Sequence, residues 1–96
     1  MDDPEDEYPD AVRLPIEDAI DLHTFAPRDV PDVVATYLEE AARAGLREVR
    51  VIHGKGTGTQ KAAVLRVLEA SPLVERFTDA PAERGGWGAT IVLLRR

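Results

Sequence analysis

Residues 48–70 read EVRVIHGKGTGTQKAAVLRVLEA, and this stretch decides the fold. Its opening residues, Glu48 to Ile52, are rich in β-branched side chains and predict a strand. A helix is predicted from Thr59 to Ala70, and its apolar side consists of Val64, Leu65, Val67 and Leu68. Because the strand runs straight through a glycine-rich segment into the helix, the stretch favours an α/β protein.

A further strand and helix are predicted before this unit. Residues 19–23 alternate apolar and polar side chains as a half-buried strand does, with Asp21 and His23 on the same face. Helix start signals follow at residues 27–31, where an Asp stands near the N-cap and a Pro in the first turn. Gly45 is expected to end this helix. Its apolar stripe consists of Val30, Val33, Val34, Tyr37, Leu38 and Ala41.

The C-terminal part of the chain predicts two more strands. Ser71-Pro72 ends the second helix, and a weaker strand is expected from Leu73 to Phe77. Residues 79–88 form a glycine-rich loop, and Ala89 to Leu94 is an apolar run typical of a strand covered on both faces. We therefore expect an α/β sandwich of two or three layers in the order β-α-β-α-β-β. Its four-stranded mixed sheet would carry two main helices, with parallel strands where a helix connects them.

Length and composition limit the class of protein. A chain of 96 residues has room for one domain, and its apolar fraction of 44% is enough for a core. There are no cysteines, which excludes disulfides and thiolate zinc sites. The chain has no apolar run long enough to span a membrane, and its N-terminus is acidic, the reverse of a secretory signal. We expect a cytoplasmic protein with no membrane partner.

The net charge of −6 is concentrated at the N-terminus. Residues 1–13 hold six acids and one base, which predicts an acidic disordered leader before a domain at residues 14–96. The leader is either a solubilising tail or an acidic strip that competes with a polyanion for the site. The rest of the chain is nearly neutral, so its charge neither requires nor excludes a nucleic-acid partner.

The glycine-rich segment Gly54-Lys55-Gly56-Thr57-Gly58 is the first candidate binding site. Glycines let a backbone approach a ligand closely, and the N–H groups at the start of the following helix suit a phosphate. Lys55 and Lys61 add positive charge, and Thr57 adds a hydroxyl donor. The spacing matches neither the nucleotide-triphosphatase loop nor the dinucleotide loop, so no nucleotide cofactor such as ATP or NAD is expected. The alternative is a tight turn that needs glycine only for its geometry.

The two histidines of the chain, His23 and His53, stand at the C-terminal ends of the first two predicted strands. Because ligands bind beyond the carboxyl ends of parallel strands, we expect both imidazoles to face one anion near the glycine-rich segment. Asp21 could orient an imidazole, ligate a divalent metal ion together with His23, or accept backbone hydrogen bonds. A histidine titrates near neutrality and can exchange protons with a nucleophile or a leaving oxygen. The alternative is that each histidine is a structural side chain.

Trp87 and Arg84 make the last loop a third candidate. Glycines flank the tryptophan, which places it on a loop, where it could stack on a base while Arg84 touches the backbone. The alternative is that Trp87 folds back over the small core.

Three segments of the chain together resemble the small MutS-related (Smr) domain. That family is marked by a hydrophobic-Asp-hydrophobic-His strand, a His-Gly-x-Gly-x-Gly loop and a Gly-Gly-x-Gly-x-Thr segment, in this order. The matching segments are Ile20-Asp21-Leu22-His23, His53-Gly54-Lys55-Gly56-Thr57-Gly58 and Gly85-Gly86-Trp87-Gly88-Ala89-Thr90. The similarity spans roughly residues 16–96.

The resemblance implies a fold similar to the C-terminal domain of bacterial translation initiation factor three. It also implies binding to DNA or RNA and, as in several members, endonuclease activity that often nicks and sometimes needs a divalent metal, here Mg²⁺ or Mn²⁺. The family's functional residues carry over to Asp21, His23, His53, Gly54, Lys55 and Gly56. One departure is Thr24-Phe25, where the family usually has glycine after the histidine. A β-branched residue resists positive φ, so we expect a different path for this loop.

The leading hypothesis is a free-standing Smr-type domain that binds nucleic acid and hydrolyses a phosphodiester. A rival is a binding module without catalysis, an adaptor in DNA repair, recombination or ribosome rescue. A third possibility is a protein that binds a small phosphorylated metabolite. The chain offers no long recognition helix with base-reading side chains, so we expect recognition of nucleic-acid structure rather than sequence.

Overall fold

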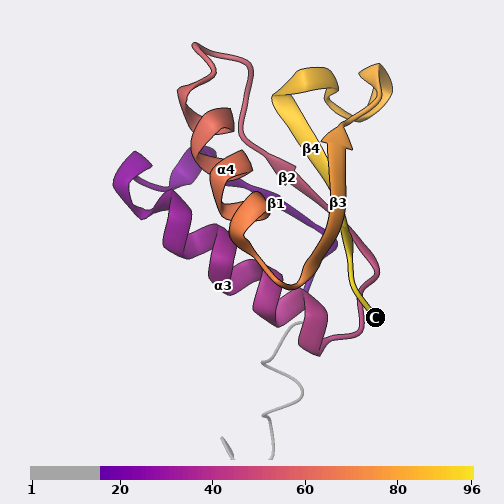
Figure 1. Cartoon of the computed structure of the whole chain (residues 1–96). Helices are drawn as coiled ribbons and strands as arrows, with labels where there is room; N and C mark the ends of the chain where they lie inside the picture. The colour runs from indigo at the N-terminus through magenta and orange to yellow at the C-terminus, as the bar shows by residue number, and fades with distance from the viewer. Residues whose placement is uncertain (1–15) are drawn as a thin grey trace, which may run out of the picture.

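A four-stranded mixed sheet and two α-helices make up the part of the chain that the computed structural model describes, residues 16–96 (Figure 1). The predicted acidic leader, residues 1–13, lies outside the described residues. The main elements follow one another as expected: β1 (Ala19–Asp21), α3 (Val30–Arg43), β2 (Glu48–Ile52), α4 (Thr59–Ala70), β3 (Val74–Asp79) and β4 (Ala89–Leu94).

The strands lie in the order β1-β2-β4-β3. β1 and β2 are parallel neighbours, as a connection through a single helix predicts. β4 lies between β2 and β3 and is antiparallel to both. The mixed sheet expected from the sequence is confirmed, and its parallel pair brings the carboxyl ends of β1 and β2 to the same end of the sheet.

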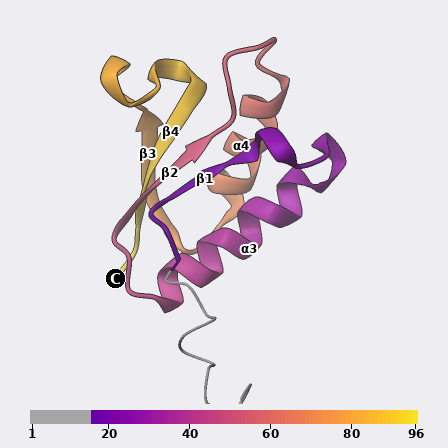
Figure 2. The same cartoon turned by 180° about the vertical axis from the view of Figure 1, so that it is seen from behind.

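Both α-helices pack on one face of the sheet, which gives two layers (Figure 2). Their buried residues share one core with alternate residues of β2 and β4, because side chains of a strand alternate between its faces. The central members of this core are Val34, Leu38, Val49, Val51, Val64, Leu68, Val92 and Leu94. On the opposite face Ala89 and Ile91 of β4 form a smaller cluster with Ala80. The prediction that β4 is covered on both faces is confirmed.

The predicted bounds of the first and third strands need correction. β1 ends at Asp21, and residues 22–24 form a 3₁₀ turn in which the Asp21 side chain accepts a hydrogen bond from the His23 N–H. His23 is therefore not part of a strand. β3 runs to Asp79 rather than Phe77, because its pairing with β4 continues to the end of that strand. A register irregularity between Val74 and Arg76 accompanies its start.

The ends of the first α-helix agree with the sequence signals in part. Gly45 follows its last turn, and the N–H groups of Gly45 and Leu46 donate to the carbonyls of Ala42 and Ala41, a Schellman motif. Asp29 occupies the N-cap position, but its side chain makes no capping hydrogen bond. None of the helices in residues 16–96 has the length and apolar character needed to cross a bilayer.

Candidate nucleic-acid interface

Two parallel strands end side by side at the candidate site. Asp21, the last residue of β1, lies opposite Ile52, the last residue of β2. The glycine loop, Gly54 to Gly58, then leads into α4 and lines a cavity of about 200 Å³ together with the first turn of that helix. The connection between β3 and β4 projects from the same end of the molecule (Figure 1). The chemistry-bearing segments are thus gathered beyond the strand ends, as expected.

Asp21 and His23 form a hydrogen-bonded pair. Oδ1 of Asp21 accepts a hydrogen bond from the backbone N–H of His23 at 2.9 Å and lies 2.5 Å from the ring nitrogen Nδ1. These two hydrogen bonds lower the pKa of Asp21 from 3.8, and the bond from the backbone N–H has the larger effect. An ionised carboxylate can only accept, so Nδ1 carries the proton and Nε2 of the neutral ring is an acceptor. Asp21 therefore orients the imidazole, one of the three roles considered for it.

The other ring nitrogen of His23 faces the glycine loop. A Cβ atom built on Gly54 would lie 3.0 Å from Nε2 of His23, and the φ angle of Gly54 is +83°. Glycine is needed here for both reasons, since other residues resist positive φ and would push the imidazole away. The His23 side chain is 64% exposed, so the imidazole beside the loop is accessible from solvent.

The family's usual glycine after His23 is absent, yet the pair forms. Thr24 is the last residue of the 3₁₀ turn, and no residue other than glycine has positive φ within residues 16–96. The turn therefore carries the chain away from β1 without the left-handed conformation that Thr24 would resist.

The expectation that both imidazoles face one anion is wrong for His53. This side chain is 5% exposed, and its Nε2 lies 2.9 Å from the hydroxyl oxygen of Thr90 on β4. Its Nδ1 lies 3.1 Å from the carbonyl oxygen of Gly54. A carbonyl only accepts, so Nδ1 donates and Nε2 of the neutral ring accepts from Thr90. The ring of His53 thus ties the start of the glycine loop to β4 and has no nitrogen left for a ligand.

Burial keeps this internal imidazole neutral. Desolvation, the largest effect, lowers the pKa of His53 from 6.5, and nearby Lys61 lowers it further. The hydrogen bond to Gly54 and the charge of Asp79 act in the opposite direction. His53 is therefore neutral at pH 7 and supports the loop in that form.

We expect this lowered pKa to make stability depend on pH. Well above pH 6.5 His53 is neutral in both the folded and the unfolded chain, so its stabilising contribution is fully present. As the pH falls through 6.5 the unfolded chain binds the proton first, and the contribution is lost as the pH approaches the lower folded pKa. Urea unfolding between about pH 7.5 and about pH 5.5 checks this. The fall in the free energy of unfolding with decreasing pH should be smaller in His53→Gln than in the unchanged protein. An equal fall in both proteins would contradict this prediction.

Gly88 contacts the start of the glycine loop through its backbone. Its carbonyl accepts hydrogen bonds from the N–H groups of His53 at 3.0 Å and Gly54 at 2.8 Å. A Cβ on Gly88 would lie 3.0 Å from Cγ of Lys55 and 3.3 Å from the carbonyl carbon of Gly54. The third family segment is thus in direct contact with the second, and glycine is needed there for the close approach.

The backbone of the glycine loop remains available to an anion. Within residues 16–96, the N–H groups of Lys55 to Gly58 donate to no protein acceptor. Gly58 is the N-cap of α4 and offers no side-chain cap. Thr57 and Thr59 bond to each other through their hydroxyls at 2.9 Å. Lys55 is exposed, so a positive side chain, free amides and a helix N-terminus lie together.

Lys61 and Trp87 lie beside the loop but contact each other. The Lys61 ammonium is 2.7 Å from Oδ1 of Asp79 and 4.7 Å from the centre of the Trp87 ring. Trp87 is 42% exposed, so it is not the core lid considered above. Lys61 was predicted to contact phosphate, but its charge is already paired within the protein.

Arg84 is not brought to the glycine loop. Its guanidinium lies 3.2 Å from a carboxylate oxygen of Glu48, the first residue of β2. Its carbonyl accepts a hydrogen bond from Arg50, also on β2. Glu48 and Arg50 alternate with buried residues that face the helices, so they point away from the helices. The structure therefore separates Arg84 from the other predicted binding residues.

The contacts of three residues at the site were not predicted from the sequence, although Gly88 and Thr90 belong to the third family segment. Thr90, Gly88 and Asp79 hold His53, the glycine loop and Lys61 respectively. A local signal existed only for His53, which directly follows β2 and continues the alternation of the core residues Val49 and Val51.

The donor atoms at this site do not form a closed metal centre. Within residues 16–96 no group of three or more His, Cys, Asp or Glu side chains is placed to hold a metal ion. Asp21 and His23, the predicted ligands, are bonded to each other.

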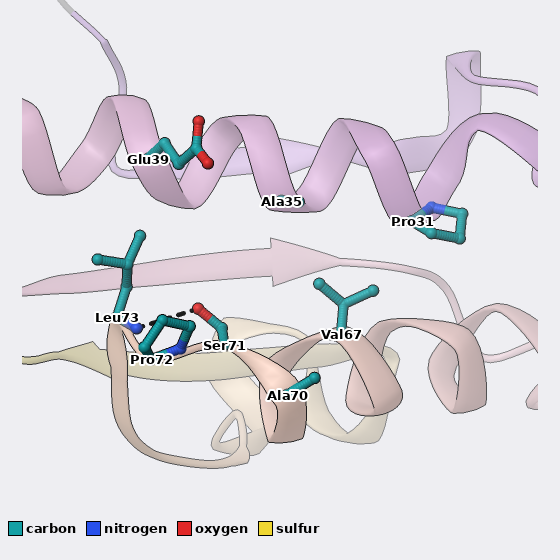
Figure 3. Close-up of a pocket in the computed structure, with 8 residues that line it drawn as sticks. All are labelled: Pro31, Ala35, Glu39, Val67, Ala70, Ser71, Pro72 and Leu73. Atoms are coloured by element: carbon teal, nitrogen blue, oxygen red, sulfur yellow. Dashed lines mark hydrogen bonds between the residues drawn. The ribbon is translucent and has the colours of Figure 1, made fainter.

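Another cavity, of about 470 Å³, lies between the two α-helices, away from the glycine loop (Figure 3). Pro31 and Ala35 of α3 face Val67 of α4 and Leu73 beyond it across this space. Glu39 is the one charged residue that lines it. An apolar groove with a single carboxylate has no group that attracts phosphate, so it is not a candidate for the nucleic-acid site.

Comparison with known proteins finds relatives of similar sequence. Two curated relatives are the Endonuclease MutS2 of Thermus thermophilus, 48% identical over 76 residues, and that of Carboxydothermus hydrogenoformans, 41% identical over 76 residues. Each match covers 79% of this chain and 10% of the relative, so the chain spans about a tenth of their length.

Two solved structures resemble the described fold. The Smr domain of Thermus thermophilus MutS2 has a TM-score of 0.78 and 39% sequence identity, over 83% of this chain and all of that one. YdaL, a stand-alone small MutS-related protein from Escherichia coli, has a TM-score of 0.79 and 26% identity, over 94% of this chain and 73% of that one. The Smr domain family profile matches residues 20–95. This chain belongs to the Smr domain family.

Proposed function

We propose that this chain binds the backbone of DNA or RNA at the glycine loop and hydrolyses a phosphodiester there. The observation that carries the proposal is the Asp21–His23 pair, which directs Nε2 of an exposed imidazole to Gly54. The relatives named Endonuclease MutS2 support the reaction class. Recognition would depend on nucleic-acid structure rather than sequence.

The loop would hold one phosphate of the backbone. Free N–H groups of Lys55 to Gly58 and the N-terminus of α4 offer hydrogen bonds and partial positive charge to its oxygens. The ammonium of Lys55 would stabilise the negative charge that grows on these oxygens in the transition state. These groups are fixed before substrate arrives, because His53 and Gly88 hold the start of the loop.

His23 would act as the general base. Its Nε2 accepts a proton from water while the water oxygen bonds to phosphorus, and Asp21 stabilises the imidazolium that forms. The bond from phosphorus to the leaving sugar oxygen breaks, that oxygen takes a proton from solvent, and the imidazolium returns its proton to solvent. The sum is one water added across one phosphodiester. His53 supports the loop and exchanges no proton.

A requirement for Mg²⁺ or Mn²⁺ stays a prediction. Two protein donors, Asp21 and His23, are too few for a dedicated metal site, and Mg²⁺ commonly binds through one or two carboxylates together with substrate phosphates. No step above depends on a metal.

The test incubates the purified protein with supercoiled plasmid and with structured RNA, each with Mg²⁺, Mn²⁺ or EDTA. We expect nicking of at least one polymer, and binding that Lys55→Ala weakens. Arg43→Ala is the matched control, since it removes one positive charge near the end of α3. Binding without cleavage in every condition would favour the non-catalytic adaptor in repair, recombination or ribosome rescue. No binding to either polymer would refute the proposal and favour a phosphorylated metabolite.

A further inference from the structure

Trp87 is a large aromatic side chain held beside the glycine loop. It is 42% exposed, and a Cβ atom on Gly58 would lie 3.9 Å from two carbons of its six-membered ring, Cη2 and Cζ3. A single exposed aromatic residue needs no ligand to explain it. The contacts that hold this ring beside the loop, however, indicate a ligand.

Lys61 covers one side of the ring. Its ammonium lies 4.7 Å from the ring centre and 2.7 Å from Oδ1 of Asp79, and the Lys61 side chain is only 16% exposed. The cation is thus held between a carboxylate and the aromatic ring, an arrangement that fixes the orientation of the indole. Lys61 lies against the ring, and 42% of the Trp87 residue stays exposed, so part of the indole is open to solvent.

We propose that the open surface of Trp87 stacks one unpaired base of the nucleic acid whose backbone occupies the glycine loop. This inference rests on the proposed function. The Trp87 ring lies next to Gly58, the last residue of the loop, where a Cβ would be 3.9 Å from it, so a stacked base and a bound phosphate belong to the same nucleotide or to neighbours. A base inside a duplex is already stacked on both faces. Trp87 would therefore select single strands, loops and frayed ends, where bases are unpaired.

Lys61 is then a positioning residue rather than a phosphate ligand. Its charge is compensated by Asp79, and it acts on nucleic acid through the ring that it orients. Lys55 remains the exposed lysine of the loop and serves the phosphate. The two lysines have separate tasks although they lie close in sequence.

Trp87 is the only tryptophan of the chain, so its fluorescence reports on this contact directly. Three probes are titrated into the full-length protein: a short single-stranded oligonucleotide, its duplex, and an oligomer of the same length made of abasic sugar-phosphate units. We expect the single strand to quench Trp87. The abasic oligomer should bind, as followed by its own end label, without quenching. The duplex should quench less than the single strand.

Variants separate stacking from general electrostatics. Stacking of one base contributes about 1–3 kcal/mol, so Trp87→Ala should weaken single-strand binding by roughly 5- to 150-fold and leave abasic binding unchanged. Trp87→Phe should restore part of the loss. Lys61→Met should reduce the quenching by the single strand more than Arg66→Met, which removes one positive charge from the same helix.

Each outcome decides between the two claims. If the abasic oligomer binds as tightly as the single strand and Trp87→Ala binds both normally, the base platform is refuted while the glycine-loop function stands. Equal losses in Lys61→Met and Arg66→Met would refute the positioning role of Lys61. If none of the three probes binds, the proposed function and this inference both fail.

Discussion

Replacing His23 by alanine should slow nicking and spare binding. A positioned general base typically contributes about 10²–10⁴-fold to the rate, so we expect the nicking rate to fall by that factor. The affinity for uncleaved polymer should change little, because the N–H groups of the glycine loop and Lys55 are untouched. The measurement is single-turnover nicking of plasmid, with affinity determined separately on a probe that is not cleaved.

Asp21→Asn provides the companion variant. An amide can keep the shape of the contact to His23, but it cannot stabilise an imidazolium as a carboxylate does. Its nicking rate should therefore fall as well, with the chain still folded. Full nicking activity in His23→Ala would show that another group is the base, and the assignment would be wrong.

Gly54→Ala should damage both stability and activity. At φ +83° an alanine costs about 1–2 kcal/mol, and its Cβ would lie 3.0 Å from Nε2 of His23. We expect a lower free energy of unfolding and slower nicking, because the imidazole must shift by a few tenths of an ångström from its place beside the loop. Urea unfolding gives the first quantity and plasmid nicking the second.

Gly45→Ala is the matched control for this change. Gly45 also has positive φ, +84°, but a Cβ there meets no atom within 4 Å. It should show a similar loss of stability, about 1–2 kcal/mol, with nicking retained. Equal nicking in the two variants would contradict the contact between Gly54 and His23 as a requirement for activity.

Local patterns predicted most of the fold. The bounds of α4 and β4 are confirmed, because helical spacing, the glycine before Thr59 and the apolar run 89–94 are properties of neighbouring residues. β1 was extended to His23 in error. Leu22 is fully buried as the alternation predicted, but the Asp21 side chain bonds to the His23 N–H and turns the backbone. Periodicity does not register such a competing hydrogen bond.

The sequence predicted which segments lie together, but not every contact between them. The glycine loop, Asp21 and His23 lie together because neighbouring motifs end two parallel strands. The partners of His53 and Lys61 come from β4 and β3, much later in the chain. Pairings between distant segments depend on the strand order β1-β2-β4-β3, which spacing along the chain does not reveal. Arg84 was misplaced for the same reason, since its partner Glu48 lies on β2.

The most direct measurement is an NMR titration of the ¹⁵N-labelled chain with a short single-stranded oligonucleotide. The backbone amides of residues 54–59 and of His23 should shift together, with one common dissociation constant. The amide resonances of residues that line the apolar groove between α3 and α4 should not shift. Shifts confined to that groove, or a saturated complex in which residues 54–59 do not respond, would contradict the glycine loop as the nucleic-acid site.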